Sequence, residues 1–298
     1  MIRSMYSGVS GLRSNQTKMD VIGNNIANVS TTAFKSSRVR FQDAFYQTQA
    51  RAQAPTTTGR GGINQQQIGQ GVTVAAIDTM FEGGQMQPTG RDLDLGIEGE
   101  GFFVVSEDTA GLTRRYTRDG ALYKDAVGNL INAEGYHILG VSNKDANGNP
   151  SQTGPAPIKT DGSNLGILSI PDTITVGGNV HKLDTYYIDG TGLISAIYDN
   201  DEVYYPGRIA MAKFTNVGGL EKLGGNTYGI TRNSGTAEYG SPNEIGLGVL
   251  RQGNLEMSNA DLANEFTEMI VTSRAYQANS RIITTSDEML QELINLKR

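Results

Sequence analysis

The sequence predicts an α+β protein, with a mainly-β central domain and N- and C-terminal α-helices that pair as a coiled-coil-like axial domain. Apolar residues recur every three or four positions at both ends, and short apolar runs separated by turn residues fill the middle. The 298 residues, 37% of them hydrophobic, suffice for one or two packed domains. We expect a terminal-helix domain at 1–30 and 258–298, an extended linker at 31–71, and a β-rich domain at 72–257 with room for a small insertion near 143–205.

The N-terminal segment carries one apolar helical stripe. Gln16 and Gly23 interrupt it, and about four heptads of helix are marginal alone in water, so the helix needs a partner. The residues of the stripe are Ile2, Met5, Val9, Leu12, Met19 and Ile26. Asn24, Asn25 and Asn28 lie in the same stretch although Asn is a poor helix former. We interpret them as donors of interhelical hydrogen bonds that fix the register of packed helices, and the alternative is an ordinary helix end.

The C-terminal segment repeats the stripe. One row has a spacing of seven residues, and a second row beside it is interrupted by polar residues. The apolar members of both rows are Leu262, Phe266, Met269, Tyr276, Ile283, Leu290 and Ile294. Ser258 or Asn259 is expected to cap the helix, and Asp261 in the first turn complements the helix dipole.

Charge is unevenly distributed along the chain. Residues 1–60 contain eight Lys and Arg against two acidic residues, whereas residues 255–298 contain four against seven. This opposition favours association of the two ends, although each exposed pair is weak and screened by salt. The net charge of -6 without a dense basic run argues against nucleic acid as a partner.

Between the helices the pattern changes twice. Residues 48–71 are rich in Gln, Thr, Gly and Ala, which indicates a linker or an adaptable surface loop. From residue 72 to about 250, short runs such as GFFVV at 101–105 and RIAMAKF at 208–214 are separated by Gly, Asn and Asp, as is typical of an all-β domain. A chain whose two ends both need partners is predicted to be a subunit of an assembly. If each copy contacts the next through two different surfaces, the copies form a helical filament instead of a closed dimer.

No catalytic, cofactor or metal site is predicted. The absence of Cys excludes thiolate metal sites and a Cys nucleophile, and the two histidines, His137 and His181, lie in no catalytic motif. Arg91, Asp92 and Asp94 alternate with leucines, which indicates a solvated strand face and not an active site. We therefore do not expect an enzyme.

The sequence gives no sign of membrane insertion. It contains no run of about 18 apolar residues, and its first twelve residues lack the apolar region of a secretory signal. If the protein leaves the cell, we expect another export route.

Several stretches resemble the flagellar rod and hook protein family. The segment at 5–40 carries the core DVIGNNIANVST, and TGRDLDLGIEGEGFFVV at 89–105 resembles the second hallmark of the family. NVGGLEKLGGNTYG at 216–229 is a third match, and the end at 255–298 is similar to the C-terminal helix of the family, where it favours the hook branch.

The resemblance implies a homopolymeric structural subunit of the bacterial flagellum. The expected assembly is the hook, the curved tube that acts as a universal joint and transmits torque from rod to filament; the alternative is the straight distal rod of the basal body. The resemblance further implies terminal helices that line an axial channel and are disordered in the monomer, export by the flagellar type III apparatus, and an extracellular location. Expected neighbours are the distal rod protein, the hook cap and the hook-filament junction proteins.

Two interpretations from other functional classes stay open: a carbohydrate-active enzyme with helical arms, and a soluble adhesin or binding module.

In this sequence, only about 60 residues separate the HILGVSNKD turn from the RIAMAKF strand. An additional outer domain, which larger members of the family carry, is therefore small or missing.

Overall fold

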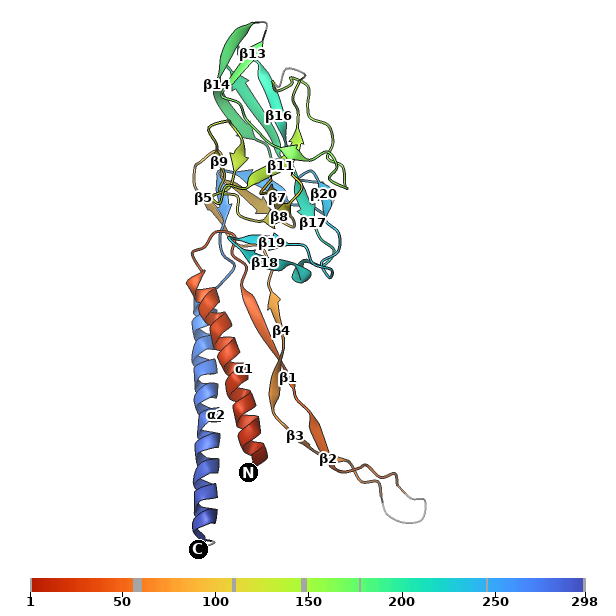
Figure 1. Cartoon of the computed structure of the whole chain (residues 1–298), viewed down its shortest axis with the longest axis vertical. Helices are drawn as coiled ribbons and strands as arrows, with labels where there is room; N and C mark the ends of the chain where they lie inside the picture. Colours follow the sequence, from red (N-terminus) through yellow and green to blue (C-terminus); the bar gives the residue numbers. More distant parts are fainter. Residues whose placement is uncertain are drawn as a thin grey trace. The chain divides into compact units, whose positions relative to one another are not determined.

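A computed structural model describes residues 2–55, 61–108, 111–145, 149–176, 178–244 and 246–296 (Figure 1). The chain divides into two compact units. The first, here called the helix unit, comprises Met1–Val29, Ser36–Met80 and Ala260–Arg298. The second, the β unit, comprises Ser30–Lys35 and Phe81–Asn259. The predicted α+β class, with a helix at each end and a mostly-β centre, is confirmed.

The helix unit contains α1 (Ile2–Ala27), α2 (Leu262–Leu296), β1 (Ser37–Asp43), β2 (Tyr46–Ala50), β3 (Gln66–Gly69) and β4 (Val72–Thr79). The β unit contains a short 3-10 helix (Val217–Gly219) and the strands β5 (Met86–Pro88), β6 (Leu95–Glu98), β7 (Phe102–Ser106), β8 (Arg114–Thr117), β9 (Tyr123–Lys124), β10 (Leu130–Ile131), β11 (His137–Ser142), β12 (Gly166–Ile167), β13 (Thr173–Val176), β14 (Asn179–Ile188), β15 (Leu193–Tyr198), β16 (Val203–Ile209), β17 (Met211–Lys213), β18 (Glu221–Gly224), β19 (Thr227–Gly229), β20 (Glu238–Gly240), β21 (Val249–Gln252) and β22 (Asn254–Glu256).

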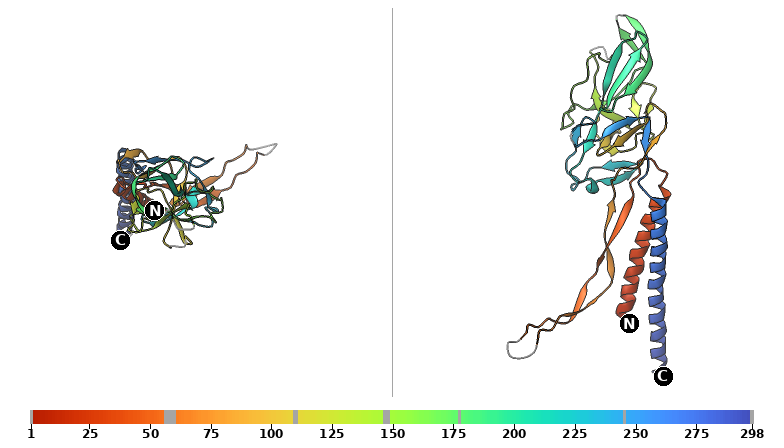
Figure 2. Two further views of the ribbon diagram at one scale, coloured as in Figure 1. Left: turned by 90° about the horizontal axis from the view of Figure 1, so that it is seen from above. Right: turned by 180° about the vertical axis from the view of Figure 1, so that it is seen from behind.

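The two helices lie side by side and antiparallel, so that both chain ends lie at the same end of the pair (Figures 1 and 2). The cap of α2 is Asp261 and not Ser258 or Asn259. Its carboxylate Oδ1 accepts a hydrogen bond from the backbone N–H of Ala263 at 2.9 Å, which satisfies a donor that the first turn leaves open. Within the described part of the chain, neither helix combines the length and hydropathy needed to cross a bilayer.

The predicted linker at 31–71 is largely strand in the described residues. β1 pairs with β4, with an irregularity between Arg40 and Phe41, and β2 pairs with β3, so that the segment forms a two-stranded ribbon. Residues 56–60 of the predicted linker lie outside the described residues. The longer segment of the β unit begins at residue 81, whereas the β-rich domain was predicted from residue 72, because β4 pairs with β1 in the helix unit.

The core of the β unit lies on both sides of β7. Phe103 and Val105 belong to one buried cluster, and Phe102 and Val104 belong to another, because successive side chains of a strand point to opposite faces. β7 is an interior strand of a 14-stranded sheet that runs in the order β13-β14-β15-β16-β11-β7-β8-β19-β18, with further strands off this path. The predicted run GFFVV is therefore buried on both faces.

The stretch predicted to hold a small insertion, 143–205, continues the same sheet through β13, β14, β15 and β16. It has a small buried cluster of its own, formed by Ile174, Ala196, Tyr198 and Tyr204. Residues 146–148 of the stretch lie outside the described residues. The stretch thus extends the β unit and is not a separate compact unit.

Alkaline pH is expected to unfold the β unit cooperatively. Burial raises the pKa of Tyr228 to about 12 and holds the pKa values of Tyr116 and Tyr198 further above the ordinary value of 10.0. Because the folded state favours the neutral phenol, this stability is fully present below pH 10 and is lost as pH rises through the folded pKa; for Tyr228 it amounts to about 3 kcal/mol.

This expectation is checked by following tyrosinate absorbance and circular dichroism together in a pH titration. The chain contains 13 Tyr and no Trp, so the tyrosinate signal is not obscured. Exposed tyrosines should titrate first, and the buried ones should titrate only with loss of the β signal. A single titration near pH 10 with an unchanged fold would contradict the expectation.

Candidate assembly surfaces

Small residues form the closest part of the contact between α1 and α2. A β-carbon at Gly11 would lie 2.6 Å from Nδ2 of Asn279, and one at Gly8 would lie 3.3 Å from Cγ1 of Ile283. Thr272 on α2 is fully buried. The distance between packed helices depends on the side chains at the contact, so these residues allow a close approach.

Polar contacts hold the same pair at both ends. Near the N-terminus of α1, the hydroxyls of Ser4 and Ser286 are 3.5 Å apart. Towards its C-terminus, Nζ of Lys18 lies 3.0 Å from Oε2 of Glu268. These contacts fix an antiparallel register, because α1 residues of rising number meet α2 residues of falling number.

Asn25 is buried where α1, α2 and β1 meet. Its Nδ2 donates to Oε1 of Glu265 and to the carbonyl of Ser37, both at 2.9 Å, and its Oδ1 accepts from the N–H of Ser37 at 3.0 Å. Burial raises the pKa of Glu265, and the hydrogen bond from Asn25 opposes this rise. Asn28, by contrast, donates to the carbonyl and Oδ1 of Asn24, which is typical of a helix end. Asn25 thus makes a hydrogen bond between the two helices, as predicted for this group of asparagines.

The predicted stripes lie beside this contact and not at its centre. The α1 residues Met5, Val9, Leu12, Met19 and Ile26 are half-buried, and the side chain of Ile2 lies outside the described residues. On α2, Met269, Ile283 and Leu290 are half-buried, whereas Leu262, Phe266, Tyr276 and Ile294 are exposed.

The α2 row that meets α1 lies one position before the predicted second row, which stays a prediction for contacts with neighbouring copies. The row that meets α1 contains Glu265, Thr272, Asn279 and Ser286, and not the row of Phe266 and Ile294. Apolar periodicity does not reveal this row, because its members are small or polar residues that allow close approach of the helices and hydrogen bonding. The apolar row is left on the outer surface of the single chain.

Many large apolar side chains of α2 are exposed in the part of the chain that the structure describes. Its exposed members are Leu262, Phe266, Ile270, Val271, Tyr276, Ile282, Met289, Leu293, Ile294 and Leu296. The ribbon carries further exposed apolar side chains, namely Phe41, Phe45, Tyr46, Ile63, Ile68 and Ile77. Exposed apolar surface of this extent is typical of a protein–protein interface.

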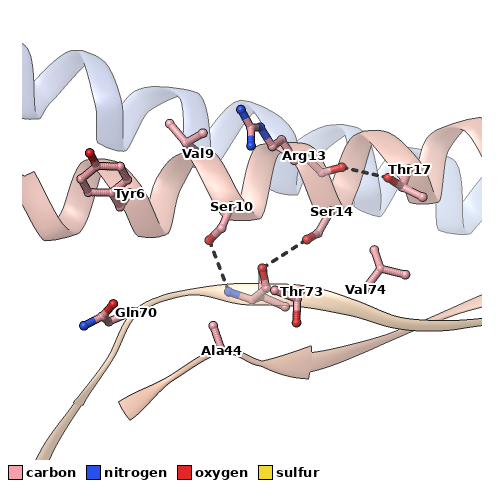
Figure 3. Close-up of a pocket in the computed structure, with 11 residues that line it drawn as sticks. Tyr6, Val9, Ser10, Arg13, Ser14, Thr17, Ala44, Gln70, Thr73 and Val74 are labelled. Carbon is pink, nitrogen blue, oxygen red and sulfur yellow. Dashed lines mark hydrogen bonds between the residues drawn. The ribbon is translucent and has the colours of Figure 1, made fainter. Parts of the chain in front are cut away.

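A groove runs along α1 on its ribbon side (Figure 3). It has a volume of about 490 Å³ and is lined by Tyr6, Val9, Ser10, Arg13, Ser14, Thr17, Ala44, Gln70, Val72, Thr73 and Val74. The N–H of Val72 donates to Oγ of Ser10 at 3.3 Å, and Oγ of Ser14 donates to the carbonyl of Val72 at 3.4 Å. Gly71 beside them has a φ of 112°, and a side chain there would collide with Ser10. The sequence prediction missed this groove.

The structure places the predicted charged residues before β6 partly in the interior of the β unit. Asp94, predicted to lie on a solvated face, is buried, because it directly precedes β6, whose first three residues are buried; its Oδ1 lies 3.4 Å from the guanidinium of Arg91. Arg91 and Asp92 are exposed. Across the described ranges, no three His, Cys, Asp or Glu side chains gather in a way that could hold a metal ion.

Family profiles match three parts of the chain. Residues 5–35 match "Flagella basal body rod protein", residues 96–196 match "Flagellar hook protein FlgE/F/G D1 domain", and residues 251–296 match "Flagellar basal body rod FlgEFG protein C-terminal". These ranges include both helices and part of the β unit.

Relatives match over the full length of both chains. The flagellar basal-body rod protein FlgG of Bacillus subtilis is 44% identical over 299 residues, and that of Borreliella burgdorferi is 36% identical over 299 residues. The flagellar hook protein FlgE of Borreliella burgdorferi is 32% identical over an alignment of 445 positions; each of the three alignments covers 100% of both chains. Among solved structures, the match to the Helicobacter pylori flagellar hook protein FlgE2 covers 57% of this chain and 100% of that chain, at 12% identity and a TM-score of 0.40. The full-length relatives show that this chain belongs to the flagellar rod and hook protein family.

Proposed function

We propose that this chain polymerises into the distal rod of the flagellum and not into the hook. The supporting observation is the length of the alignments. The FlgG rod proteins align with almost no net insertion, whereas the alignment with the Borreliella burgdorferi hook protein has 445 positions for the 298 residues of this chain, an excess of 147. Identity is also higher to the rod protein of that organism, at 36% against 32%. The distal rod was the alternative that the sequence left open.

The difference in length between this chain and the hook relative affects whether a tube of its copies can bend. In a curved rotating tube, distances between subunits change as each row passes through the inner and outer sides of the bend, so outer contacts must adapt. At least 147 positions of the alignment with the hook relative have no residue of this chain. A tube held by the helix pair and the β unit alone is expected to be straight and stiff, as a drive shaft requires.

Polymerisation supplies the cover that the exposed apolar side chains lack. Fully burying one large apolar side chain contributes about 1.5–3 kcal/mol, so a few of those on α2 suffice to drive association. A two-stranded ribbon is marginal alone in water and gains most from contact with a neighbouring copy. Export of loosely folded ends through the flagellar type III apparatus, and contacts with neighbouring axial proteins, belong to the same proposal.

Electron microscopy of the purified protein tests the proposal. The full chain, concentrated in high salt to strengthen apolar burial, is imaged by negative stain beside a version without residues 1–30 and 262–298. We expect straight tubes from the full chain and none from the truncated one. Curved tubes would assign the chain to the hook instead, and a chain that stays monomeric would overturn the polymerisation itself.

A further inference from the structure

We infer that the groove between α1 and the ribbon receives the C-terminal end of α2 from a second copy of this chain. The inference rests on the proposed polymerisation and names the two surfaces that meet. Both surfaces belong to the helix unit, but they lie on different elements. Contact between two different surfaces does not close into a dimer and can propagate along a filament.

The receiving surface is preformed. Ser10 and Ser14 lie on the side of α1 that faces the ribbon, and their bonds to Val72 hold the two walls together (Figure 3). Val9 and Val74 supply apolar surface. The walls leave a volume of about 490 Å³, which accommodates several side chains of a docked helix.

The occupying surface is the end of α2. Ser4, in the first turn of α1, already meets Ser286, so α2 continues beyond the start of α1 (Figures 1 and 2). In this last part Met289, Leu293 and Leu296 are 48%, 51% and 83% exposed. Their spacing of four and three places them on one face, the pattern of anchors by which a helix docks into a groove. The end of α2 points away from the groove of its own chain, so a second copy must supply the helix that fills it.

Charge favours this occupant. Between residues 282 and 296, ahead of the final Lys297 and Arg298 of the sequence, lie Asp287, Glu288 and Glu292 and no Lys or Arg. The groove has Arg13 in its lining and no acidic residue. The two surfaces therefore attract each other, and an acidic helix fits the groove better than a basic one would.

Disulfide trapping tests the contact, because the chain contains no cysteine of its own. Thr73→Cys and Leu293→Cys chains are mixed, polymerised and oxidised; a disulfide requires β-carbons about 3.5–4.5 Å apart, so it reports direct contact. We expect a crosslinked dimer in the tubes and not in dilute monomer. The matched control replaces Leu293→Cys by Ile270→Cys, which is also exposed on α2 but lies in the part that is paired with α1.

A charge exchange gives a second test that does not depend on crosslinking. Arg13→Glu and Glu292→Arg are each expected to raise the critical concentration for polymerisation about two- to fivefold, and the double variant is expected to restore it. The inference is overturned if tubes form but residues 73 and 293 do not crosslink in them, or if residue 73 crosslinks to residue 270 with the same yield. Either result would leave the proposed function intact. Failure of the unmodified chain to form tubes would instead overturn the proposed function.

Discussion

Replacement of Glu256 by Gln is expected to lower the free energy of unfolding of the β unit by about 3–5 kcal/mol. Oε1 of Glu256 lies 2.6 Å from Nζ of Lys35, and Oε2 lies 2.9 Å from Nε of Arg118. All three side chains are buried, with exposed fractions between 0% and 3%. Without the carboxylate, two cations remain in an apolar interior with no anion, and the N–H of Gly84 loses a charged acceptor.

Urea unfolding followed by circular dichroism measures this loss. The matched control is Glu98→Gln, because Oε2 of Glu98 also lies 2.7 Å from a guanidinium nitrogen, that of Arg251, but both side chains are exposed. An exposed pair contributes less than about 1 kcal/mol, so the control should unfold almost like the original chain. Equal losses in the two variants would show that burial of the triad is unimportant.

The pH dependence of the Glu256→Gln variant provides an independent check. Burial lowers the pKa of Lys35, Arg118 lowers it further, and Glu256 opposes both, so removal of Glu256 must lower it more. Because the unfolded chain binds the proton of Lys35 more tightly than the folded chain does, the free energy of unfolding rises with pH between the folded pKa of Lys35 and its ordinary value of 10.5. The deficit of the variant should therefore shrink as pH rises towards 10, below the range in which buried tyrosines ionise.

The fold class was predictable because periodicity records burial over many residues. The terminal stripes specified two helices, and short apolar runs such as GFFVV specified strands of a β domain; the burial of GFFVV on both faces is seen only in the structure. The buried triad was not predictable, since Lys35 and Glu256 are 221 residues apart and nothing local distinguishes them from surface charges. Pairing of β2 with β3 was also missed, because these Gln- and Thr-rich strands lack the apolar alternation that marks a strand in a core.

The choice between rod and hook was open in the sequence for an identifiable reason. The terminal segments point to the family as a whole, because the constraint on them is helix pairing, which rod and hook subunits share. A length in the sequence bears on the proposed assignment to the rod: about 60 residues between two strands leave little room for an outer domain. The similarity of the C-terminal helix to the hook branch points the other way, and the full-length alignments support the proposal of the rod.

Replacement of Gly11 by Leu is expected to raise the critical concentration for polymerisation by about five- to hundredfold. Even a β-carbon at this position would lie 2.6 Å from the side-chain amide of Asn279, and a full Leu side chain must push α1 away from α2. Overpacking of this kind costs about 1–3 kcal/mol, and each 1.4 kcal/mol is a factor of ten in an association constant. Sedimentation of tubes over a series of protein concentrations measures the change.

Gly23→Leu is the matched control, because Gly23 also lies inside α1 but a β-carbon there would meet nothing within 4 Å. Replacing glycine inside a helix removes a penalty of up to about 1 kcal/mol, so this variant should polymerise at least as well as the original chain if the α1–α2 contact alone decides assembly. Loss of polymer in both variants would instead mean that neighbouring copies press against α1 all around. In that case the close approach at Gly8 and Gly11 would be one of several packed faces, and the exposed row of Phe266 and Ile294 would be the first place to look for the others.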